Sequence, residues 1–464
     1  MKKNTRLILS GLFVLILTAL ACTISIPGSG TIDSAATSVA GTVNALAGAA
    51  ADVLTAMPHD PAATEAPSVE LPTLAPPPFA SPLRVAFVSP AGDLYTWAEG
   101  MGSPLSLVSS GDVSESVVSP DGTLIVFTRY DSSYQFIALE VINADGSNRR
   151  ILLDAAAMAG FPGSPYSIGS QPGQIKWLPG SHTLAFNTHL LFEGPGLAYH
   201  ETLYLLDTDT GTISSLLNTG TESWKFFYSP DGAKIAITTP TGINIFAADG
   251  SLIQNGVLTY DFVNTASEYA WVASPLWSID STTLAAGIPP VNPFDVPPGE
   301  SKVYTFPYNA ASPELKLQTV MPFLSGGVVA FSPDMTKYLY YTPVSGTTFN
   351  LNIGYMDGSP ATLYTTDEFA FDPVWSPDSQ HFYYATGSGD TSTPYVGAVG
   401  AAPVAILEYT NPMHAVWIDA NRYLVFSYSG HVSKLLLGTI GAPAGVIYDH
   451  AVADPTFLTF SVNR

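Results

Sequence analysis

The sequence predicts an all-β fold, a β-propeller built from four-stranded blades. Three observations lead to this prediction. A Ser-Pro-Asp turn between two apolar strands recurs along the chain, as in VVSPDGTLIVFT (Val117 to Thr128) and VWSPDSQHFYYATG (Val374 to Gly387). A second kind of turn, such as Asp145-Gly146, alternates with the first. The 39 Gly and 38 Pro, with only 12% charged residues, suit short strands joined by many turns.

The chain begins with a segment typical of a secretory signal peptide, predicted over residues 1–21. Lys2, Lys3 and Arg6 precede an uncharged apolar run from Leu7 to Ala21. This run is shorter than the ~20 residues that a membrane-spanning helix needs, and a basic region precedes it. Cleavage after residue 21 would remove three of the 16 basic residues and no acidic residue.

Cys22 is the only cysteine of the protein, and it directly follows Ala19-Leu20-Ala21. This segment resembles the lipobox of bacterial lipoproteins, although Ala19 stands where the common form has Leu. The resemblance implies that Cys22 is lipidated, so no disulfide forms and the core alone holds the exported domain. We expect an exported protein that is lipid-anchored to the cell envelope, at the outer face of the cytoplasmic membrane or at the outer membrane of a two-membrane cell. A buried cysteine in an ordinary membrane anchor is the alternative.

Residues 22–80 are predicted to form a stalk that starts with the lipidated cysteine. The segment PHDPAATEAPSVELPTLAPPPFASP is rich in Pro, Ala and Thr and cannot bury enough apolar surface to fold alone. Before it, apolar residues from Val39 to Met57 recur at alternating steps of four and three, which line one helical face. A weak Ala-rich helix is expected here, and a short coiled-coil seam is the alternative. We expect a monomer, and weak self-association through the stalk is the alternative.

From residue 81 to residue 464, the two kinds of turn divide the chain into repeats of four strands. The first strand of each repeat ends in an aromatic residue or Val, here called the anchor, directly before the Ser-Pro-Asp-like turn. The anchors are Val118, Trp177, Tyr228, Trp277, Phe331, Trp375 and Trp417. Equivalent turn residues lie 41 to 59 residues apart, which fits units that bury their faces by stacking around a ring.

The two ends of this region predict how the ring closes. The first repeat, LRVAFVSPAGDLYTW, has no first strand of its own, and the final PTFLTFSVNR looks like a first strand without its sequel. Alignment of Phe460-Ser461-Val462-Asn463 with Trp375-Ser376-Pro377-Asp378 lets residues 456–462 supply the innermost strand of the first blade. This closure gives eight blades and removes free sheet edges. Seven blades is the alternative, if the divergent unit around Pro179 or Ile279 is an insertion.

The Ser-Pro-Asp-Gly turn and the hydrophobic strand after it resemble the WD40-like PD40 repeat. That repeat occurs in the TolB propeller and in propellers of prolyl-oligopeptidase-type peptidases. The resemblance covers residues 82–464 and implies a TolB-like propeller on a bacterial lipoprotein. It implies no particular activity, and the chain contains no Gly-x-Ser-x-Gly nucleophile elbow.

Four long insertions predict a ligand-binding surface: Asp154 to Gln174, His189 to Glu201, Asp261 to Pro275, and Pro289 to Ser301. In a propeller, connections between blades and between second and third strands lie on the same face, so all four insertions crowd one face over blades 2 to 5. Aromatic residues on long loops above a rigid scaffold favour binding; the alternative is that they plug the channel mouth. The candidate ligand-binding residues are Phe161, Tyr166, Phe192, Tyr199, His200, Tyr269, Trp271 and Phe294.

The charge balance limits the partners. With 38 acidic and 16 basic residues, the chain has a net charge of −22, so it repels phosphate backbones and nucleic acid is not expected. The recurring Asp residues occupy equivalent tight turns, which predicts capping of backbone N–H groups. We expect no metal, no cofactor and no catalytic residue. The predicted function is non-catalytic binding of an envelope protein, peptide or polymer through the long-loop face. A polysaccharide lyase or hydrolase acting in the propeller funnel is the alternative.

Overall fold

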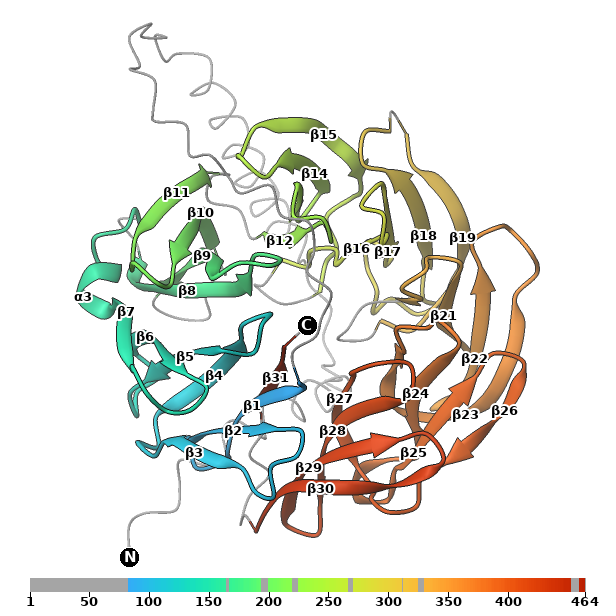
Figure 1. The fold of residues 1–464 in the computed structure, drawn as a ribbon. Coiled ribbons are helices and arrows are strands. Elements are labelled where there is room, and N and C mark those ends of the chain that lie inside the picture. Colours follow the sequence, from blue (N-terminus) through green and yellow to red (C-terminus); the bar gives the residue numbers. More distant parts are fainter. Residues whose placement is uncertain are drawn as a thin grey trace, which may run out of the picture. The chain divides into compact units, whose positions relative to one another are not determined.

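The computed structural model describes residues 82–163, 167–192, 199–218, 224–265, 270–310, 312–323, 329–451 and 459–463. All of them belong to one unit, Leu71–Arg464, and they form a ring of eight four-stranded antiparallel blades (Figure 1). The predicted all-β propeller with eight blades is confirmed, and the divergent units around Pro179 and Ile279 are complete blades. The predicted signal peptide and stalk, including Cys22, lie outside the described residues.

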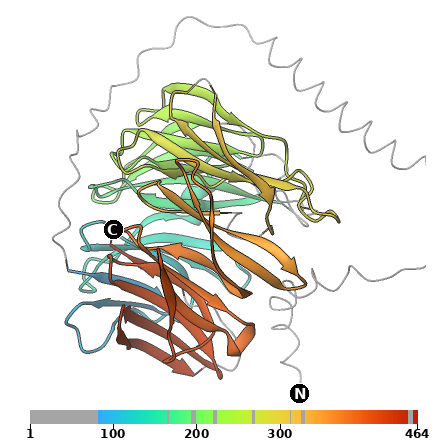
Figure 2. The same ribbon diagram turned by 90° about the vertical axis from the view of Figure 1, so that its right-hand side faces the viewer.

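Each blade has its first strand near the ring axis and its fourth strand at the rim. Seen from the side, the sheets of neighbouring blades stack face to face (Figure 2).

Blade 1 contains β31 (Thr459–Val462), β1 (Arg84–Val88), β2 (Leu94–Ala98) and β3 (Leu105–Val108). Blade 2 contains β4 (Val113–Val118), β5 (Leu124–Tyr130), β6 (Phe136–Asn143) and β7 (Arg150–Asp154). Blade 3 contains β8 (Ser167–Trp177), β9 (Thr183–Phe192), β10 (Tyr199–Asp207) and β11 (Ile213–Asn218). Blade 4 contains β12 (Lys225–Tyr228), β13 (Lys234–Thr239), β14 (Gly242–Ala247) and β15 (Leu252–Thr259).

The second half of the ring repeats this order. Blade 5 contains β16 (Leu276–Trp277), β17 (Thr283–Ile288), β18 (Glu300–Pro307) and β19 (Glu314–Val320). Blade 6 contains β20 (Val329–Phe331), β21 (Lys337–Ser345), β22 (Thr348–Tyr355) and the first part of β23 (Thr362–Trp375). Blade 7 contains the second part of β23, β24 (His381–Thr386), β25 (Thr393–Ala398) and β26 (Ala401–Ala405). Blade 8 contains β27 (Pro412–Trp417), β28 (Arg422–Ser429), β29 (Val432–Thr439) and β30 (Ala442–Ala451).

Helix is scarce in the part of the chain that the structure describes. It comprises α3 (Ala155–Met158) after blade 2 and the 3₁₀ turn η1 (Gly389–Thr391) in blade 7. Among these residues, no helix has the length and apolar content needed to cross a lipid bilayer.

The Ser-Pro-Asp turns owe their recurrence to side-chain hydrogen bonds within the turn. In blade 6, Ser332 Oγ donates to Asp334 Oδ1 over 2.6 Å and accepts a bond from Lys337 N over 2.9 Å. Thr336 N donates to the same Asp334 oxygen over 3.0 Å. Burial opposes ionisation of this carboxyl, but hydrogen bonds from Ser332 and Thr336 outweigh it and lower the pKa of Asp334 to about 2. The carboxylate therefore caps the turn, as its position in the repeat predicted.

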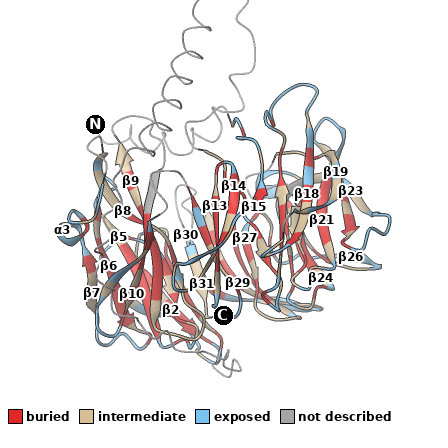
Figure 3. Ribbon diagram, turned by 90° about the horizontal axis from the view of Figure 1, so that it is seen from above, coloured by how far each residue is buried: buried red, intermediate tan, exposed pale blue. Residues whose placement is uncertain are grey.

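The anchor side chains connect each blade to the one before it. Four anchors are tryptophans whose indole N–H donates to a backbone carbonyl one residue before the preceding anchor. These bonds are Trp177 to Val117 (3.4 Å), Trp277 to Phe227 (3.0 Å), Trp375 to Ala330 (2.9 Å) and Trp417 to Val374 (2.8 Å). Buried positions accordingly follow the strands around the whole ring, where the sheet faces meet (Figure 3).

The ring closes as predicted, because the chain's last strand completes the first blade. β31 pairs antiparallel with β1, and Phe460 lies opposite Phe87. Figure 1 shows β31 beside β1, close to the ring axis. Ser461 extends the closure to blade 2, since its Oγ accepts a hydrogen bond from Val118 N over 3.1 Å.

The predicted alignment of this strand was wrong by two residues. In blade 7 the anchor Trp375 pairs with Phe382 on the second strand, and in blade 1 the equivalent pair is Val462 with Val85. Val462, and not Phe460, therefore occupies the anchor position. Asn463 then stands where the other blades have the turn serine. Its backbone N donates to Arg84 O over 3.2 Å, and its Oδ1 accepts from Arg84 N over 2.7 Å. The side-chain amide replaces the serine hydroxyl, which is why the closing strand needs no Ser-Pro-Asp motif.

Candidate functional site

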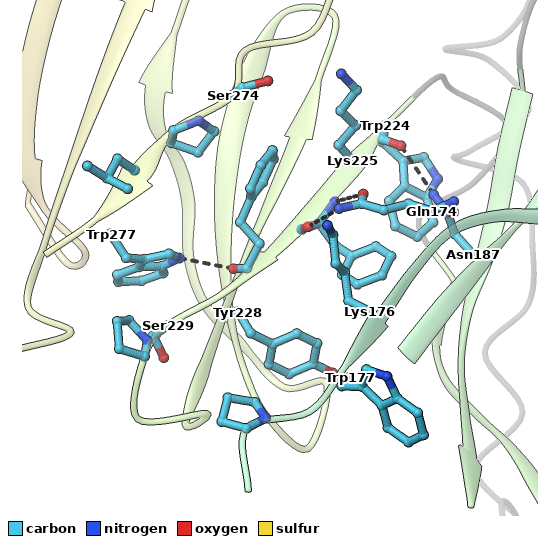
Figure 4. A pocket seen from close by; sticks show the side chains of 16 residues that line it. Gln174, Lys176, Trp177, Asn187, Trp224, Lys225, Tyr228, Ser229, Ser274 and Trp277 are labelled. Atoms are coloured by element: carbon cyan, nitrogen blue, oxygen red, sulfur yellow. Dashed lines mark hydrogen bonds between the residues drawn. The ribbon is translucent and has the colours of Figure 1, made fainter. Parts of the chain in front are cut away.

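A cavity of about 760 Å³ lies beside the innermost strands of blades 3, 4 and 5 (Figure 4). Its walls come from β8, β12, β16 and the residues that flank them. They combine aromatic rings, proline rings and two lysine side chains, Lys176 and Lys225. The volume falls within the roughly 300–1,000 Å³ of typical ligand sites.

The propeller repeat explains why polar side chains reach this wall. The position three residues before the anchor is equivalent in every blade, and it is polar in the six blades whose side chain there is described. Those six residues are Glu115, Gln174, Lys225, Ser274, His414 and Thr459. All except Gln174 are exposed, so this position faces the open centre of the ring.

Gln174 and Asn187 hold the wall between blades 3 and 4 in one geometry. Gln174 Nε2 donates to Phe226 O over 2.9 Å, and Gln174 Oε1 accepts from Phe226 N over 3.1 Å. Asn187 is fully buried; its Oδ1 accepts from Gln174 N over 2.7 Å and its Nδ2 donates to Trp224 O over 3.3 Å. The two amides thus fasten β8 to β12, so the wall is pre-organised for a ligand.

Two lysines dominate the electrostatics of the cavity. Neither Lys176 nor Lys225 forms an ion pair with any residue that the structure describes. Lys225 opens to the cavity, but protein surrounds it, and the resulting desolvation lowers the pKa of its ammonium group. Desolvation also raises the pKa of Glu115 on β4, although the positive charge of Lys176 acts to lower it.

The Tyr228 hydroxyl is the other notable polar group of this wall. Figure 4 shows its ring directed from β12 toward Trp177 of blade 3. The oxygen is buried and has no hydrogen-bond partner among the described residues. Burial raises the pKa of this phenol, so it is a neutral hydroxyl that can donate one hydrogen bond.

Three predicted ligand-binding residues pack against other aromatic rings. Phe161 packs edge-on against Tyr204, with the ring centroids 4.6 Å apart, and contacts the core that blades 2 and 3 share. Trp271 packs edge-on against Tyr260 at 5.7 Å. Phe294 is 60% exposed and contacts Phe323 at 5.4 Å.

The other candidates are at the ends of strands or outside the described residues. Phe192 is half-buried at the end of β9, where its backbone lies opposite Ser167. Tyr199 and His200 begin β10, with their backbone opposite Leu190 and His189. Tyr166 and Tyr269 lie outside the described residues. Of the candidates whose side chains are described, namely Phe161, Phe192, Trp271 and Phe294, none lines the cavity.

Two of the four insertions contact each other between blades 4 and 5. Asn264, in the connection from β15 to β16, donates its N–H to Val291 O over 2.7 Å. Val291 belongs to the loop between β17 and β18, which also carries Phe294. The third and fourth insertions therefore lie together, next to blades that line the cavity.

Sequence reasoning missed Lys176 and Lys225. The signal that could have identified them is their distance from the anchor: Lys176 directly precedes Trp177, and Lys225 stands three residues before Tyr228. Counting back from each anchor places both on innermost strands that border the channel.

Acidic clusters in the described blades are explained by turns. Asp207 Oδ1 accepts bonds from the backbone N–H groups of Asp209 and Thr210, each over 2.9 Å. No group of three or more His, Cys, Asp or Glu side chains suited to a metal ion is found among the residues that the structure describes.

His182 forms a charged bridge between two blades. Its Nε2 lies 3.0 Å from Asp121 Oδ2 of blade 2, and its Nδ1 lies 3.3 Å from Asp209 Oδ2 of blade 3. Partial burial opposes the charge, but the hydrogen bond to Asp121 and the charges of both carboxylates raise the pKa of His182. The protonated ring therefore donates to both carboxylates and ties the two blades together.

We expect His182→Gln to lower the free energy of unfolding at about pH 5 and to change it little at about pH 9. The folded-state pKa lies above the unfolded value of about 6.5, so the bridge stabilises fully below that value and is lost as the pH rises through the folded-state pKa. Both aspartates are largely solvated, so the effect should not exceed about 1 kcal/mol. Urea unfolding of both proteins at each pH measures it, and a difference of equal size at the two pH values would contradict a charge-based bridge.

No protein-family model and no curated protein matches the sequence. Among solved structures, a putative TolB from Agrobacterium tumefaciens is similar at 16% identity and a TM-score of 0.35, covering 54% of this chain and 89% of that one. The β-propeller domain of the Trilobed protease from Pyrococcus furiosus is similar at 13% identity and a TM-score of 0.45, covering 74% and 99%. An oligogalacturonate lyase from Vibrio parahaemolyticus is similar at 10% identity and a TM-score of 0.45, covering 70% and 92%. These likenesses concern the fold alone, and the fold is the propeller that the PD40 resemblance implied.

Proposed function

We propose that this chain is an exported, lipid-anchored, non-catalytic propeller that binds a peptide, protein or envelope polymer in its channel. The observation that supports binding is the cavity of about 760 Å³ beside blades 3 to 5. The long insertions belong to blades 2 to 5, so a ligand held by their face of the ring is close to this cavity. Export and the lipid anchor rest on Cys22 and the apolar segment before it.

The chemistry of the wall favours recognition of an amphipathic ligand. Trp177 and Tyr228 are half-buried and offer rigid ring surfaces that lose little conformational entropy on binding. The indole of Trp277 is fixed by its bond to Phe227 O, and the amides of Gln174 and Asn187 hold the neighbouring strands. A rigid wall of this kind lowers the entropic cost of binding.

A polysaccharide lyase or hydrolase is the second candidate, and one observation favours it. Desolvation lowers the pKa of Lys225, which is the direction that a general base requires. The test is whether the wild-type protein cleaves a captured polymer and so creates new chain ends. If it does, and the Lys225→Met variant does not, the enzymatic function replaces the binding proposal.

Photo-crosslinking in the native envelope tests the binding proposal. We expect a photoreactive residue at Ser274, which is exposed and lines the cavity, to capture a peptide, protein or polymer. The matched control is the same residue at Ser215, which is exposed on the outermost strand of blade 3. Equal adducts at both positions, or none at Ser274, would contradict binding in the channel.

A further inference from the structure

We propose that the cavity binds the C-terminal carboxylate of a peptide, an inference that rests on the binding function proposed above. Lys176 from β8 and Lys225 from β12 bring two ammonium groups to one cavity from adjacent blades (Figure 4). Lysine ammonium groups next to apolar rings are suited to an anionic group at the end of an apolar segment.

The two ammonium groups stand out because most other cations of the described blades are paired. Arg129, Arg149, Lys234, Lys316, Lys337 and Arg422 all form ion pairs. The chain has 38 acidic residues with which to neutralise 16 basic ones, yet two lysines share a cavity without an ion pair among the described residues. Lys225 is partly desolvated, and such a charge is costly without a partner, so a ligand anion is the natural counter-charge.

One acidic side chain acts on this pair from a neighbouring strand. Glu115 on β4 interacts with Lys176 through its charge, yet it forms no ion pair with any described residue. Desolvation raises the pKa of Glu115, and the charge of Lys176 opposes that shift. His414 of blade 8 is also near the ring centre, and desolvation lowers its pKa and so favours its neutral form. Glu115 therefore offsets part of the charge of Lys176, but no ion pair ties it to either lysine among the described residues.

Tyr228 adds a neutral donor to the same wall. Its hydroxyl oxygen is buried without a hydrogen-bond partner among the residues described, and the ring points toward Trp177. A buried hydroxyl that lacks a partner costs free energy unless a bound group or water accepts its proton. In Figure 4 this hydroxyl lies near Trp177 and away from the end of the Lys225 side chain, so its acceptor would be another group of the peptide, such as a backbone carbonyl.

The charge of the whole chain favours a peptide end over an acidic polysaccharide. A polymer with a carboxylate on every unit brings many negative charges toward a protein of net charge −22. A peptide end brings a single carboxylate to a cavity that holds two ammonium groups. The side chains before it can then pack on Trp177 and Pro230, which line the same cavity.

The test uses the full chain in detergent and two N-acetylated peptide mixtures with about five randomised positions, enough to fill the cavity. One mixture ends in a free carboxylate and the other in an amide. We expect the immobilised protein to retain the carboxylate form about tenfold more than the amide form, measured by mass spectrometry. Lys176→Met and Lys225→Met should each remove most of this preference. Lys302→Met is the matched control, because Lys302 is exposed on β18, has no ion pair among the described residues and does not line the cavity.

The outcomes separate this inference from the proposed function. Equal retention of both mixtures, abolished by filling the cavity with Ser274→Trp, would overturn the carboxylate inference and leave binding in the channel intact. Retention of a uronic-acid oligosaccharide in a lysine-dependent manner, without retention of either peptide mixture, would likewise overturn the peptide assignment. If both lysine variants still retain the carboxylate mixture in preference to the amide mixture, the anion site lies elsewhere and the inference is overturned. Unfolding midpoints equal to wild type show that the variants are folded.

Discussion

Deletion of residues 459–464 is expected to lower the free energy of unfolding by at least about 4 kcal/mol, because it opens the ring. The deletion removes β31, so the fully buried Val85 and Phe87 of β1 lose their neighbouring strand. Arg84 N loses its acceptor on Asn463, and Val118 N loses the hydroxyl of Ser461. Both blade 1 and its contact with blade 2 are therefore weakened at once.

Urea unfolding and size-exclusion chromatography measure this effect. The truncated chain also exposes an unpaired edge of β1, so self-association should increase. Asn463→Ser is the matched control: it restores the residue that most blades carry at this position and should remain within about 1 kcal/mol of wild type. A truncated protein as stable and as monomeric as wild type would show that the end strand does not close the ring.

The fold could be predicted from the sequence because each blade repeats the same local chemistry. A serine hydroxyl and an aspartate carboxylate close the turn with hydrogen bonds inside six residues, as Ser332 and Asp334 do. Interactions this local leave a spacing pattern that can be read without coordinates. The closing strand was placed correctly but two residues out of register, since Asn463 performs the serine's task with a different side chain.

The site was harder to predict because it depends on contacts between blades. Lys176 and Lys225 are 49 residues apart in sequence, and only the ring brings their strands to one cavity. The long insertions suggested a surface of exposed aromatics, but such insertions can also fold back on their own blade. Phe161 does so after α3, where it packs on Tyr204, and composition alone cannot distinguish that arrangement from an exposed one.

Trp417→Ala is expected to lower the free energy of unfolding by about 3–5 kcal/mol. The indole is only 1% exposed, packs 5.3 Å from the Tyr423 ring and donates to Val374 O of blade 7 over 2.8 Å. The substitution therefore leaves a cavity between two blades and also strips a carbonyl of its partner.

The two contributions can be separated with phenylalanine. Trp417→Phe keeps most of the ring packing and removes the N–H donor, so it should cost about 1–3 kcal/mol. Trp177→Phe is the comparison, because that indole is half-buried and its bond to Val117 O is longer, at 3.4 Å, so its loss should be smaller. Urea unfolding of the three variants gives the ranking. If Trp417→Phe is as stable as wild type, packing alone joins the blades. If both phenylalanine variants lose the same stability, burial and bond length do not determine the strength of the contact between blades.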